Sequence, residues 1–156
     1  MNNKILILGL GNSEHCDDGI GVHVINCLKK RSQISNAEFI HGGMLNGDIT
    51  DTIENTDCLI VVDMTEMDIA PGSIRVFEGI EMDAFITSHD ESPHHETGLK
   101  NALSAALRDG RLPSHRALVG VQPKTFDGGN ELTEEVARAV PYACCKVFEI
   151  AENWKI

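Results

Sequence analysis

Short runs of apolar residues recur along the chain and alternate with segments of helical periodicity. Residues 4 to 10 form a near-continuous run of isoleucine and leucine, the pattern of a strand that is buried on both faces of a parallel sheet. Residues 18 to 31 then place Ile20, Val24 and Leu28 one helical turn apart and end in basic residues, where the helix dipole favours them. A strand, a loop and a helix in this order predict the start of a βαβ unit.

The same alternation continues to the end of the chain. Further strands are predicted over residues 37 to 41, 58 to 63, 73 to 77 and 115 to 121, and further helices over residues 46 to 54, 96 to 110 and 132 to 151. The strand over residues 73 to 77 is short and alternating, which indicates a sheet edge, and Pro141 predicts an interruption or a kink in the last helix. Residues 79 to 95 are polar, rich in histidine and without a period, so we expect a surface loop with at most one helical turn near Phe85.

These elements predict an α/β fold, a three-layer α/β/α sandwich with a mostly parallel, twisted sheet of about five strands. A length of 156 residues with 42% hydrophobic content fits a single domain over residues 1 to 156. The net charge of -11 disfavours nucleic acid and anionic membranes as partners, and it favours a basic protein or a cation. The five cysteines do not resemble a disulfide framework, and the apolar runs are too short for a signal peptide or a membrane span, so we expect a cytoplasmic protein.

Ligands and catalytic groups gather at the carboxyl ends of the strands in a parallel sheet flanked by helices. The first such end is the turn that runs from Gly9 through Gly11 to Asp17 and Asp18. Its glycines suggest a dinucleotide site, but a third glycine is missing at the required spacing, and the two carboxylates would repel a pyrophosphate. The plain explanation of Asp17 and Asp18 is an N-cap plus a first-turn charge near the helix N-terminus, and for Asp17 this explanation is favoured.

Asp63 and three histidines are the other candidates. Asp63 ends a buried apolar run, where it either caps a turn or offers a carboxylate that binds a cation or polarises a water. His89, His94 and His95 lie in the polar segment, and any one of them alone is more often a solvated side chain than a ligand. Two carboxylates and an imidazole together form a ligand set that nickel, zinc or manganese accepts. The sequence contains no G-x-S-x-G elbow and no Walker-type loop.

These segments together resemble the hydrogenase maturation endopeptidases over nearly the whole chain. The resemblance is carried by Gly9-Leu10-Gly11-Asn12, Asp17-Asp18-Gly19-Ile20-Gly21-Val22, His41-Gly42-Gly43, Leu59-Ile60-Val61-Val62-Asp63, Pro71-Gly72-Ser73, His95-Glu96-Thr97-Gly98-Leu99, Leu118-Val119-Gly120-Val121-Gln122-Pro123 and Leu132-Thr133-Glu134-Glu135-Val136. It implies a twisted, parallel-type sheet between helices. It also implies an aspartic-type endopeptidase that trims the C-terminus of a NiFe-hydrogenase large-subunit precursor after nickel has been inserted.

The resemblance further implies roles for individual residues. Asp18 and Asp63 correspond to the family's two acidic metal contacts, and His95 corresponds to its histidine contact by spacing to the following helix. His94 is the alternative match, with one residue inserted, and His89 is a distant third. The three groups either bind the precursor's nickel or let a carboxylate activate the attacking water. We favour nickel recognition, with carboxylate-assisted water attack as a second duty.

The family pattern places the nickel in the precursor, requires no tightly bound organic cofactor and implies a monomer that meets the precursor one to one. Glu14, His15 and Cys16 depart from it, because this turn is more apolar in relatives, and the loop before His95 is slightly long. Cys16 beside His15 is weak evidence for a thiol nucleophile. The alternative function is a non-enzymatic nickel-binding or metallochaperone domain, which would hold the metal without a precursor. A dinucleotide-binding domain would bind its ligand regardless of Asp63 or His95.

Overall fold

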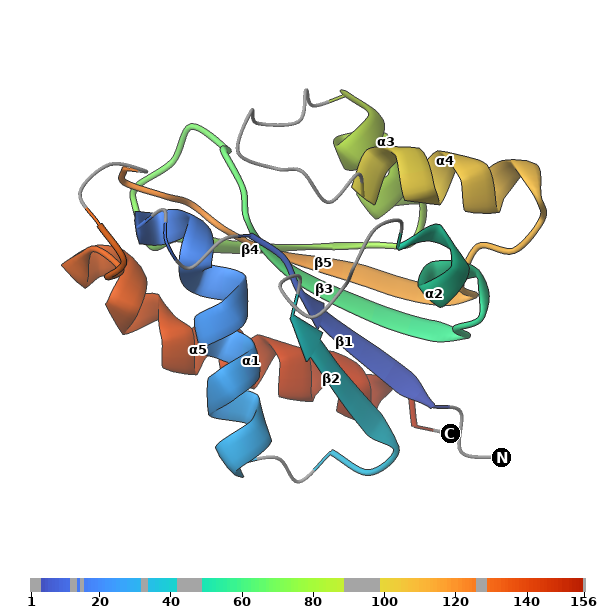
Figure 1. Cartoon of the computed structure of the whole chain (residues 1–156), viewed down its shortest axis with the longest axis horizontal. Coiled ribbons are helices and arrows are strands. Elements are labelled where there is room, and N and C mark those ends of the chain that lie inside the picture. Colours follow the sequence, from blue (N-terminus) through green and yellow to red (C-terminus); the bar gives the residue numbers. More distant parts are fainter. Residues whose placement is uncertain are drawn as a thin grey trace.

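A five-stranded sheet forms the centre of the computed structural model of the chain (Figure 1). The structure describes residues 4–11, 14, 16–31, 34–41, 49–88, 99–125 and 129–155. The strands are β1 (Ile5–Gly9), β2 (Ala37–His41), β3 (Cys58–Met64), β4 (Ile74–Glu78) and β5 (His115–Val121). They lie in the order β2-β1-β3-β5-β4, and only the β4–β5 pair is antiparallel. The predicted fold class is confirmed, and so is the position of β4 at a sheet edge.

Helices cover both faces of this sheet (Figure 1). One face carries α1 (Ile20–Arg31), which follows a 3₁₀ turn over Cys16–Gly19, and α5 (Glu134–Asn153); the other carries α2 (Thr50–Glu54), α3 (Ile80–Ser88) and α4 (Leu99–Arg108). A hydrophobic core lies on each face of the sheet, and successive strand residues point to opposite cores. Ile60 and Val62 face α1 and α5, whereas Leu59 and Val61 face the other helices. The helices predicted over residues 46 to 54 and 96 to 110 are confirmed in their described parts.

Parallel pairing brings the carboxyl ends of β1, β3 and β5 to one edge of the sheet, which we call the strand-end edge. Gly9 lies opposite Val62 in register, and Asp63 lies opposite Gly120. The backbone N–H of Leu10 donates to the Val62 carbonyl at 3.0 Å, which extends the pairing one residue beyond β1. Residues that directly follow these strands therefore meet at the strand-end edge.

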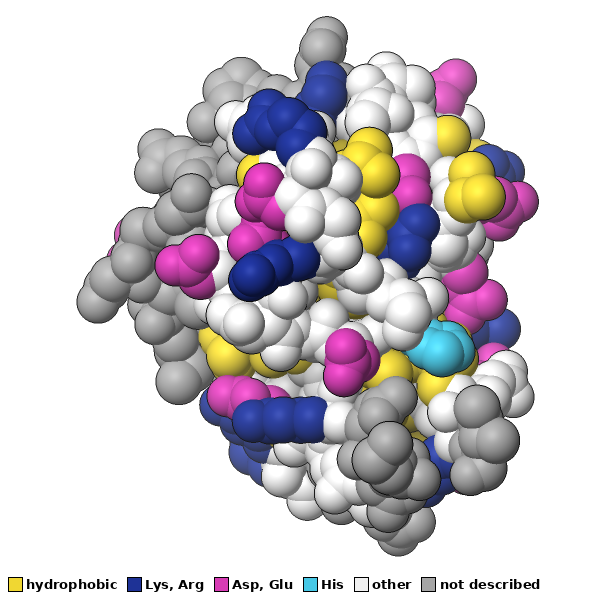
Figure 2. Space-filling view, turned by 90° about the vertical axis from the view of Figure 1, so that its right-hand side faces the viewer, with side chains coloured by type: hydrophobic (Ala, Val, Ile, Leu, Met, Phe, Trp, Pro, Cys, Tyr) yellow, Lys and Arg dark blue, Asp and Glu magenta, His cyan; other side chains and the backbone are white. Residues whose placement is uncertain are grey.

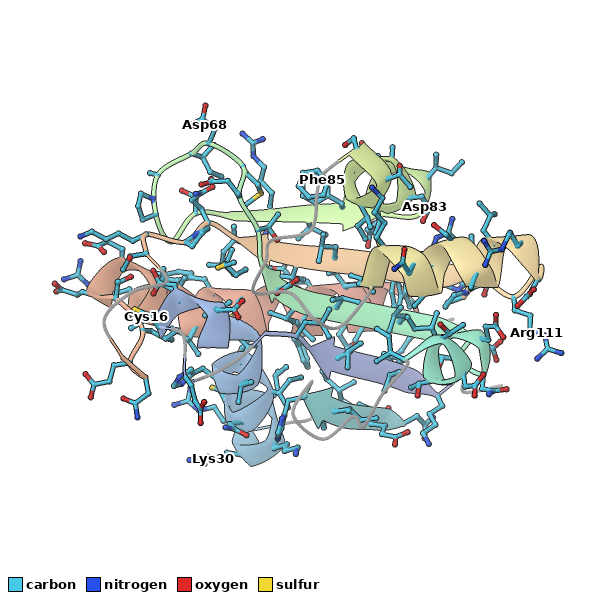
Figure 3. All side chains as sticks on the ribbon, turned by 45° about the horizontal axis from the view of Figure 1, so that its top comes forward. Cys16, Lys30, Asp68, Asp83, Phe85 and Arg111 are labelled. Carbon is cyan, nitrogen blue, oxygen red and sulfur yellow. The ribbon has the colours of Figure 1, made fainter. Side chains whose placement is uncertain are left out.

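The two ends of the sheet carry different side chains. The edge where the parallel strands begin faces the viewer in Figure 2, and acidic and basic side chains are interspersed there with small apolar areas. In Figure 3, Arg111 lies at this end, while Cys16 and Asp68 lie toward the strand-end edge. The described side chains in this view thus have the mixed charges of a solvated surface.

A helix replaces most of the surface loop that the sequence predicts over residues 79 to 95, so that prediction is wrong for α3. Met82 and Ile86 of α3 are buried in the core on that face of the sheet. Phe85 stacks on Phe77 of β4, with ring centroids 4.1 Å apart. Packing of these apolar side chains stabilises a helix that is short and whose apolar residues do not form a clear stripe.

An ion pair joins α3 to β5. Arg116 donates from Nε and Nη2 to the two carboxylate oxygens of Asp83 at 2.8 and 2.6 Å. Its Nη1 donates to the Pro113 carbonyl at 3.0 Å. The Arg116 side chain is 13% exposed, and its contact with the Asp83 carboxylate raises the pKa of the guanidinium. The pair therefore anchors α3 at a partly buried position.

Replacing Asp83 with Ala is expected to lower the free energy of unfolding by about 1–2 kcal/mol, because Arg116 then keeps a partly buried charge without its partner. Urea denaturation measures the effect. Glu81→Ala removes an exposed acidic side chain from the same helix and serves as the control, with an expected change below about 0.5 kcal/mol. Equal stabilities for the two variants would contradict an anchoring role for the ion pair.

The last helix, α5, runs continuously through Pro141, so the interruption predicted there is wrong. Pro141 cannot donate to the Ala137 carbonyl, but both residues are exposed and water can bind that oxygen. The opposite stripe of the helix, which includes Ala143 and Val147, is buried against the sheet. Of the helices that the structure describes, none, α5 included, has the length and apolar character needed to cross a membrane.

Candidate functional site

Buried polar side chains mark the strand-end edge. Among the described residues, the buried polar or charged side chains are those of Asp17, Asp18, Asp63, Thr65 and Gln122. Each belongs to a segment that ends or follows β1, β3 or β5. Burial of a carboxylate or an amide costs free energy unless a partner compensates for it, so their presence at one edge indicates a functional site.

Close backbone packing explains the glycines around Asp18. Gly11 has a φ of 101°, and a Cβ on it would lie 2.0 Å from the Asp18 carbonyl oxygen. A Cβ on Gly21 would lie 2.3 Å from the Leu10 carbonyl oxygen and 2.7 Å from that of Val62. Only glycine permits these approaches, so the turn after β1 is pressed against the start of α1 and the end of β3. These glycines therefore serve close backbone contacts within the protein.

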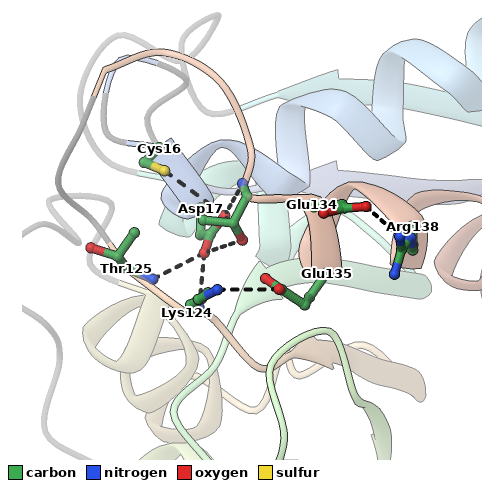
Figure 4. Close-up of polar contacts among 8 residues, drawn as sticks. Cys16, Asp17, Lys124, Thr125, Glu134, Glu135 and Arg138 are labelled. Atoms are coloured by element: carbon green, nitrogen blue, oxygen red, sulfur yellow. Dashed lines mark hydrogen bonds and ion pairs between the residues drawn. The ribbon is translucent and has the colours of Figure 1, made fainter.

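The carboxylate of Asp17 binds donors from the segment that follows β5 (Figure 4). Its Oδ2 accepts hydrogen bonds from the backbone N–H groups of Lys124 and Thr125 at 2.8 and 3.0 Å. Its Oδ1 accepts from the backbone N–H and the hydroxyl of Thr133 at 2.8 and 2.9 Å. Asp17 does lie in a first turn, as predicted, but its hydrogen bonds join that turn to the start of α5. Its role is to hold two distant segments together beside Asp18.

Asp63 lies near the end of β3 and is 6% exposed. Every second residue of a strand points to the same face, so the Asp63 side chain lies on the same face as Leu59 and Val61. This face is covered by α2, α3 and α4. Opposite it lies Gly120, where a Cβ would be 2.8 Å from the hydroxyl oxygen of Thr65. The Thr65 hydroxyl donates to the Asp63 carbonyl at 3.3 Å. Gly120 thus leaves room for Thr65 next to Asp63.

Thr65 and Gln122 are further buried polar residues at the strand-end edge, and neither of them was assigned a role from the sequence. Gln122 directly follows the buried strand β5, as Asp63 ends β3, and this shared position is the signal that could have found it. His41, at the end of β2, also lies at this edge. Its buried Nδ1 has no hydrogen-bond partner among the described residues. His41 lies on the same face of β2 as Ala37 and Phe39, which pack toward α1, and this is the face opposite Asp63.

His89, His94 and His95 lie outside the described residues, so the predicted histidine ligand stays a prediction. The segment that contains them joins α3 to α4, two helices on the same face of the sheet as the Asp63 side chain. This order of elements keeps them candidates for the site. Within the part of the chain that the structure describes, no three His, Cys, Asp or Glu side chains are grouped so that they could hold a metal ion.

Comparison with known proteins identifies the family to which this sequence and fold belong. The family described as hydrogenase maturation protease matches residues 22–150. The chain belongs to this family. The maturation protease is 33% identical over 147 residues to the hydrogenase 2 maturation protease of Escherichia coli K12, covering 93% of this chain and 88% of that protein. It is 31% identical over 155 residues to the hydrogenase expression/formation protein HupD of Rhizobium leguminosarum, covering 98% of this chain and 76% of that protein.

Solved structures agree with this assignment. The hydrogenase maturating endopeptidase HybD from E. coli superposes with a TM-score of 0.86 at 30% identity, covering 96% of this chain and 93% of that chain. The hydrogenase maturation protease HybD from Thermococcus kodakarensis superposes with a TM-score of 0.74, but at 23% identity it supports the fold alone. The family predicted from the sequence and the assignment of the chain as an endopeptidase are confirmed.

Proposed function

We propose that this maturation protease removes the C-terminal extension of a nickel-loaded NiFe-hydrogenase large-subunit precursor. In this proposal Asp18, Asp63 and one histidine between residues 89 and 95 recognise the nickel that the precursor carries. The metal is part of the substrate, and a monomer of the protease meets one precursor. Recognition of the nickel restricts cleavage to precursors in which loading is complete.

The observation that carries this proposal is the burial of two carboxylates at one edge of the sheet. Asp18 is fully buried and Asp63 is 6% exposed. A bound cation stabilises the ionised form of a buried carboxylate, so buried carboxylates at this edge favour recognition of a cation. Nickel accepts a mixed set of oxygen and nitrogen ligands, which two carboxylates and an imidazole supply.

Water is the nucleophile that these residues best support. A carboxylate can take a proton from the water that attacks the scissile carbonyl, and nickel can polarise that carbonyl or the water. Cys16 is the thiol in the turn that contains Asp18. Its Sγ lies 4.0 Å from Oδ1 of Asp17, an oxygen that already accepts a hydrogen bond from Thr133. Asp18 or Asp63 is therefore the better candidate for the group that activates the nucleophile.

The alternative, a nickel-binding or metallochaperone domain, predicts different behaviour. A carrier would retain nickel by itself and would leave the precursor's mass unchanged. Membership of a protease family favours cleavage. Incubating the protein with a large-subunit precursor separates the two functions, because the experiment reports both the mass of the precursor and the metal content of the purified protein.

The test is to incubate the protein with a large-subunit precursor, with and without nickel, and to follow the precursor by intact mass. We expect loss of a C-terminal peptide from the nickel-loaded form alone. His95→Ala is expected to slow this cleavage by about 100-fold or more, because it removes a ligand of the recognised metal. The matched variants His94→Ala and His89→Ala are expected to retain activity within about threefold.

Two outcomes would contradict the proposal, and a third would change only the assignment of the histidine. Equal cleavage of the loaded and unloaded precursors would exclude nickel recognition. If His94→Ala were inactive and His95→Ala active, the histidine assignment would move by one residue and the rest of the proposal would stand. No cleavage, combined with nickel that stays bound to the protein, would support the metal carrier.

A further inference from the structure

One glutamine closes the loop that follows Asp63. Residues 65–73 connect β3 to β4 and return to the end of β5. The backbone N–H of Gln122 donates to the Ser73 carbonyl at 2.9 Å, and the N–H of Gly72 donates to the Gln122 carbonyl at 2.8 Å. These bonds extend the pairing of β4 with β5 and hold the distal part of the loop.

The Gln122 side chain reaches the proximal part of the same loop. Its Oε1 accepts a hydrogen bond from the backbone N–H of Met67 at 2.7 Å. Its Nε2 donates to the carboxylate of Glu66 and to the Pro123 carbonyl, the latter at 3.2 Å. Because Gln122 is only 4% exposed, water cannot readily replace these partners if one of them is lost.

Glu66 is suited to remain an acceptor in this arrangement. Besides the amide of Gln122, its carboxylate accepts a hydrogen bond from the backbone N–H of Asp68 at 3.1 Å. Hydrogen bonds from Gln122 and from the backbone N–H groups of Asp68 and Met67 hold the pKa of Glu66 below its ordinary value. Glu66 is thus anionic at neutral pH, and the donor and acceptor roles in the pair are defined.

The start of the loop is coupled to Asp63 through Thr65. The Thr65 backbone N–H donates to the Val121 carbonyl at 2.9 Å, and its hydroxyl donates to the Asp63 carbonyl at 3.3 Å. A shift of residues 66–68 would therefore pull on Thr65, and through it on the last residues of β3. Thr65 thus links the start of the loop to the backbone of Asp63.

We propose that Gln122 is a positioning residue for precursor cleavage, which holds residues 65–68 through Met67 and Glu66 and so keeps the Asp63 carboxylate in its working orientation. This inference rests on the proposed role of Asp63. Gln122 acts through the loop and does not touch the precursor. Displacement of a catalytic group by about 1 Å can slow a reaction by about 100-fold, so such support matters for the rate.

A charge swap tests the inference. Gln122→Glu places a second carboxylate against Glu66, which should separate the two segments. The double variant Glu66→Gln, Gln122→Glu restores one donor and one acceptor with their places exchanged. Glu66→Gln alone keeps an acceptor for the Gln122 amide and serves as the matched control.

Two readouts distinguish positioning from a merely structural role. The first is steady-state cleavage of the nickel-loaded precursor: we expect kcat of Gln122→Glu to fall about tenfold with KM changed less than about twofold, and the swap to recover within about threefold of wild type. The second is exchange of the Met67 backbone amide with solvent deuterium. It should be about tenfold faster in Gln122→Glu and normal in the swap and in Glu66→Gln.

The outcomes separate this inference from the function on which it rests. If Gln122→Glu cleaved at the wild-type rate while the Met67 amide exchanged rapidly, or if the swap restored protection of Met67 without restoring kcat, positioning by Gln122 would be wrong. Unchanged Met67 exchange in Gln122→Glu would show that Gln122 does not hold the loop. Failure of the wild-type protein to cut the loaded precursor would overturn the proposed function itself, and with it any role of Gln122 in cleavage.

Discussion

Replacing Asp17 with Ala is expected to lower the free energy of unfolding by about 3–4 kcal/mol, the largest loss of stability that we predict for this chain. Asp17 is fully buried, and its carboxylate accepts from the backbone N–H groups of Lys124, Thr125 and Thr133. Alanine would leave these donors without their acceptor, and only backbone hydrogen bonds, such as that from the Asp17 N–H to the Thr125 carbonyl, would still join the 3₁₀ turn to the segment after β5. Chemical denaturation monitored by circular dichroism measures the loss.

Two matched variants show whether the charge or the position causes this effect. Asp17→Asn keeps the shape but directs an amide N–H₂ toward N–H donors, so we expect it to lose about half or more of the same free energy. Glu131→Ala removes an exposed carboxylate from the segment that Asp17 binds and is expected to change stability by less than about 0.5 kcal/mol. If Asp17→Ala were as stable as Glu131→Ala, the hydrogen bonds of Asp17 would not hold the two segments together.

Asp63→Asn is expected to reduce cleavage of the nickel-loaded precursor by about 10²–10⁴-fold, the largest effect on activity that we predict. Asn keeps the size of the side chain, but it cannot take a proton from water and is a poorer ligand for a divalent metal. Asp18→Asn should have an effect of the same order. Glu78→Gln alters an exposed carboxylate on β4 and is the control, with an expected change below about threefold.

Measurements of precursor binding then separate the two duties of these carboxylates. If they recognise nickel, Asp63→Asn should weaken binding of the loaded precursor and leave binding of the unloaded precursor unchanged. If Asp63 mainly activates water, binding should persist while the single-turnover rate falls. Normal cleavage by both Asp63→Asn and Asp18→Asn would show that the site has been misassigned.

Much of the fold could be predicted because the central strands are buried on both faces. A strand with helices on each side must be apolar along its whole length, so β1 and β3 stand out as unbroken runs. A charged residue at the end of such a run is conspicuous, and this is why the sequence pointed to Asp63 as a candidate. Gln122 stands in the corresponding place after β5, but an amide is a common surface residue and was less conspicuous.

The elements that were misjudged depend on contacts that leave no local pattern. The sequence of α3 lacks a clear apolar stripe, and it is a helix because Met82 and Ile86 reach the core and Asp83 reaches Arg116. Pro141 is tolerated inside α5 because its face of the helix is exposed. Local propensity indicated a loop in the first case and a break in the second, and the tertiary environment overrode both.

By itself, the sequence determined the family, the layered α/β class, the positions of the strands and the two candidate carboxylates, Asp18 and Asp63, since each of these leaves a mark within a few consecutive residues. Only the tertiary structure decided what Asp17 and Gln122 bind. The backbone N–H groups that bind the Asp17 carboxylate lie 107 to 116 positions away in the chain, and the loop residues that bind the Gln122 side chain lie 55 and 56 positions away. Hydrogen bonds over such separations have no period or spacing that a sequence could display, because they exist only once the sheet has brought its strand ends together.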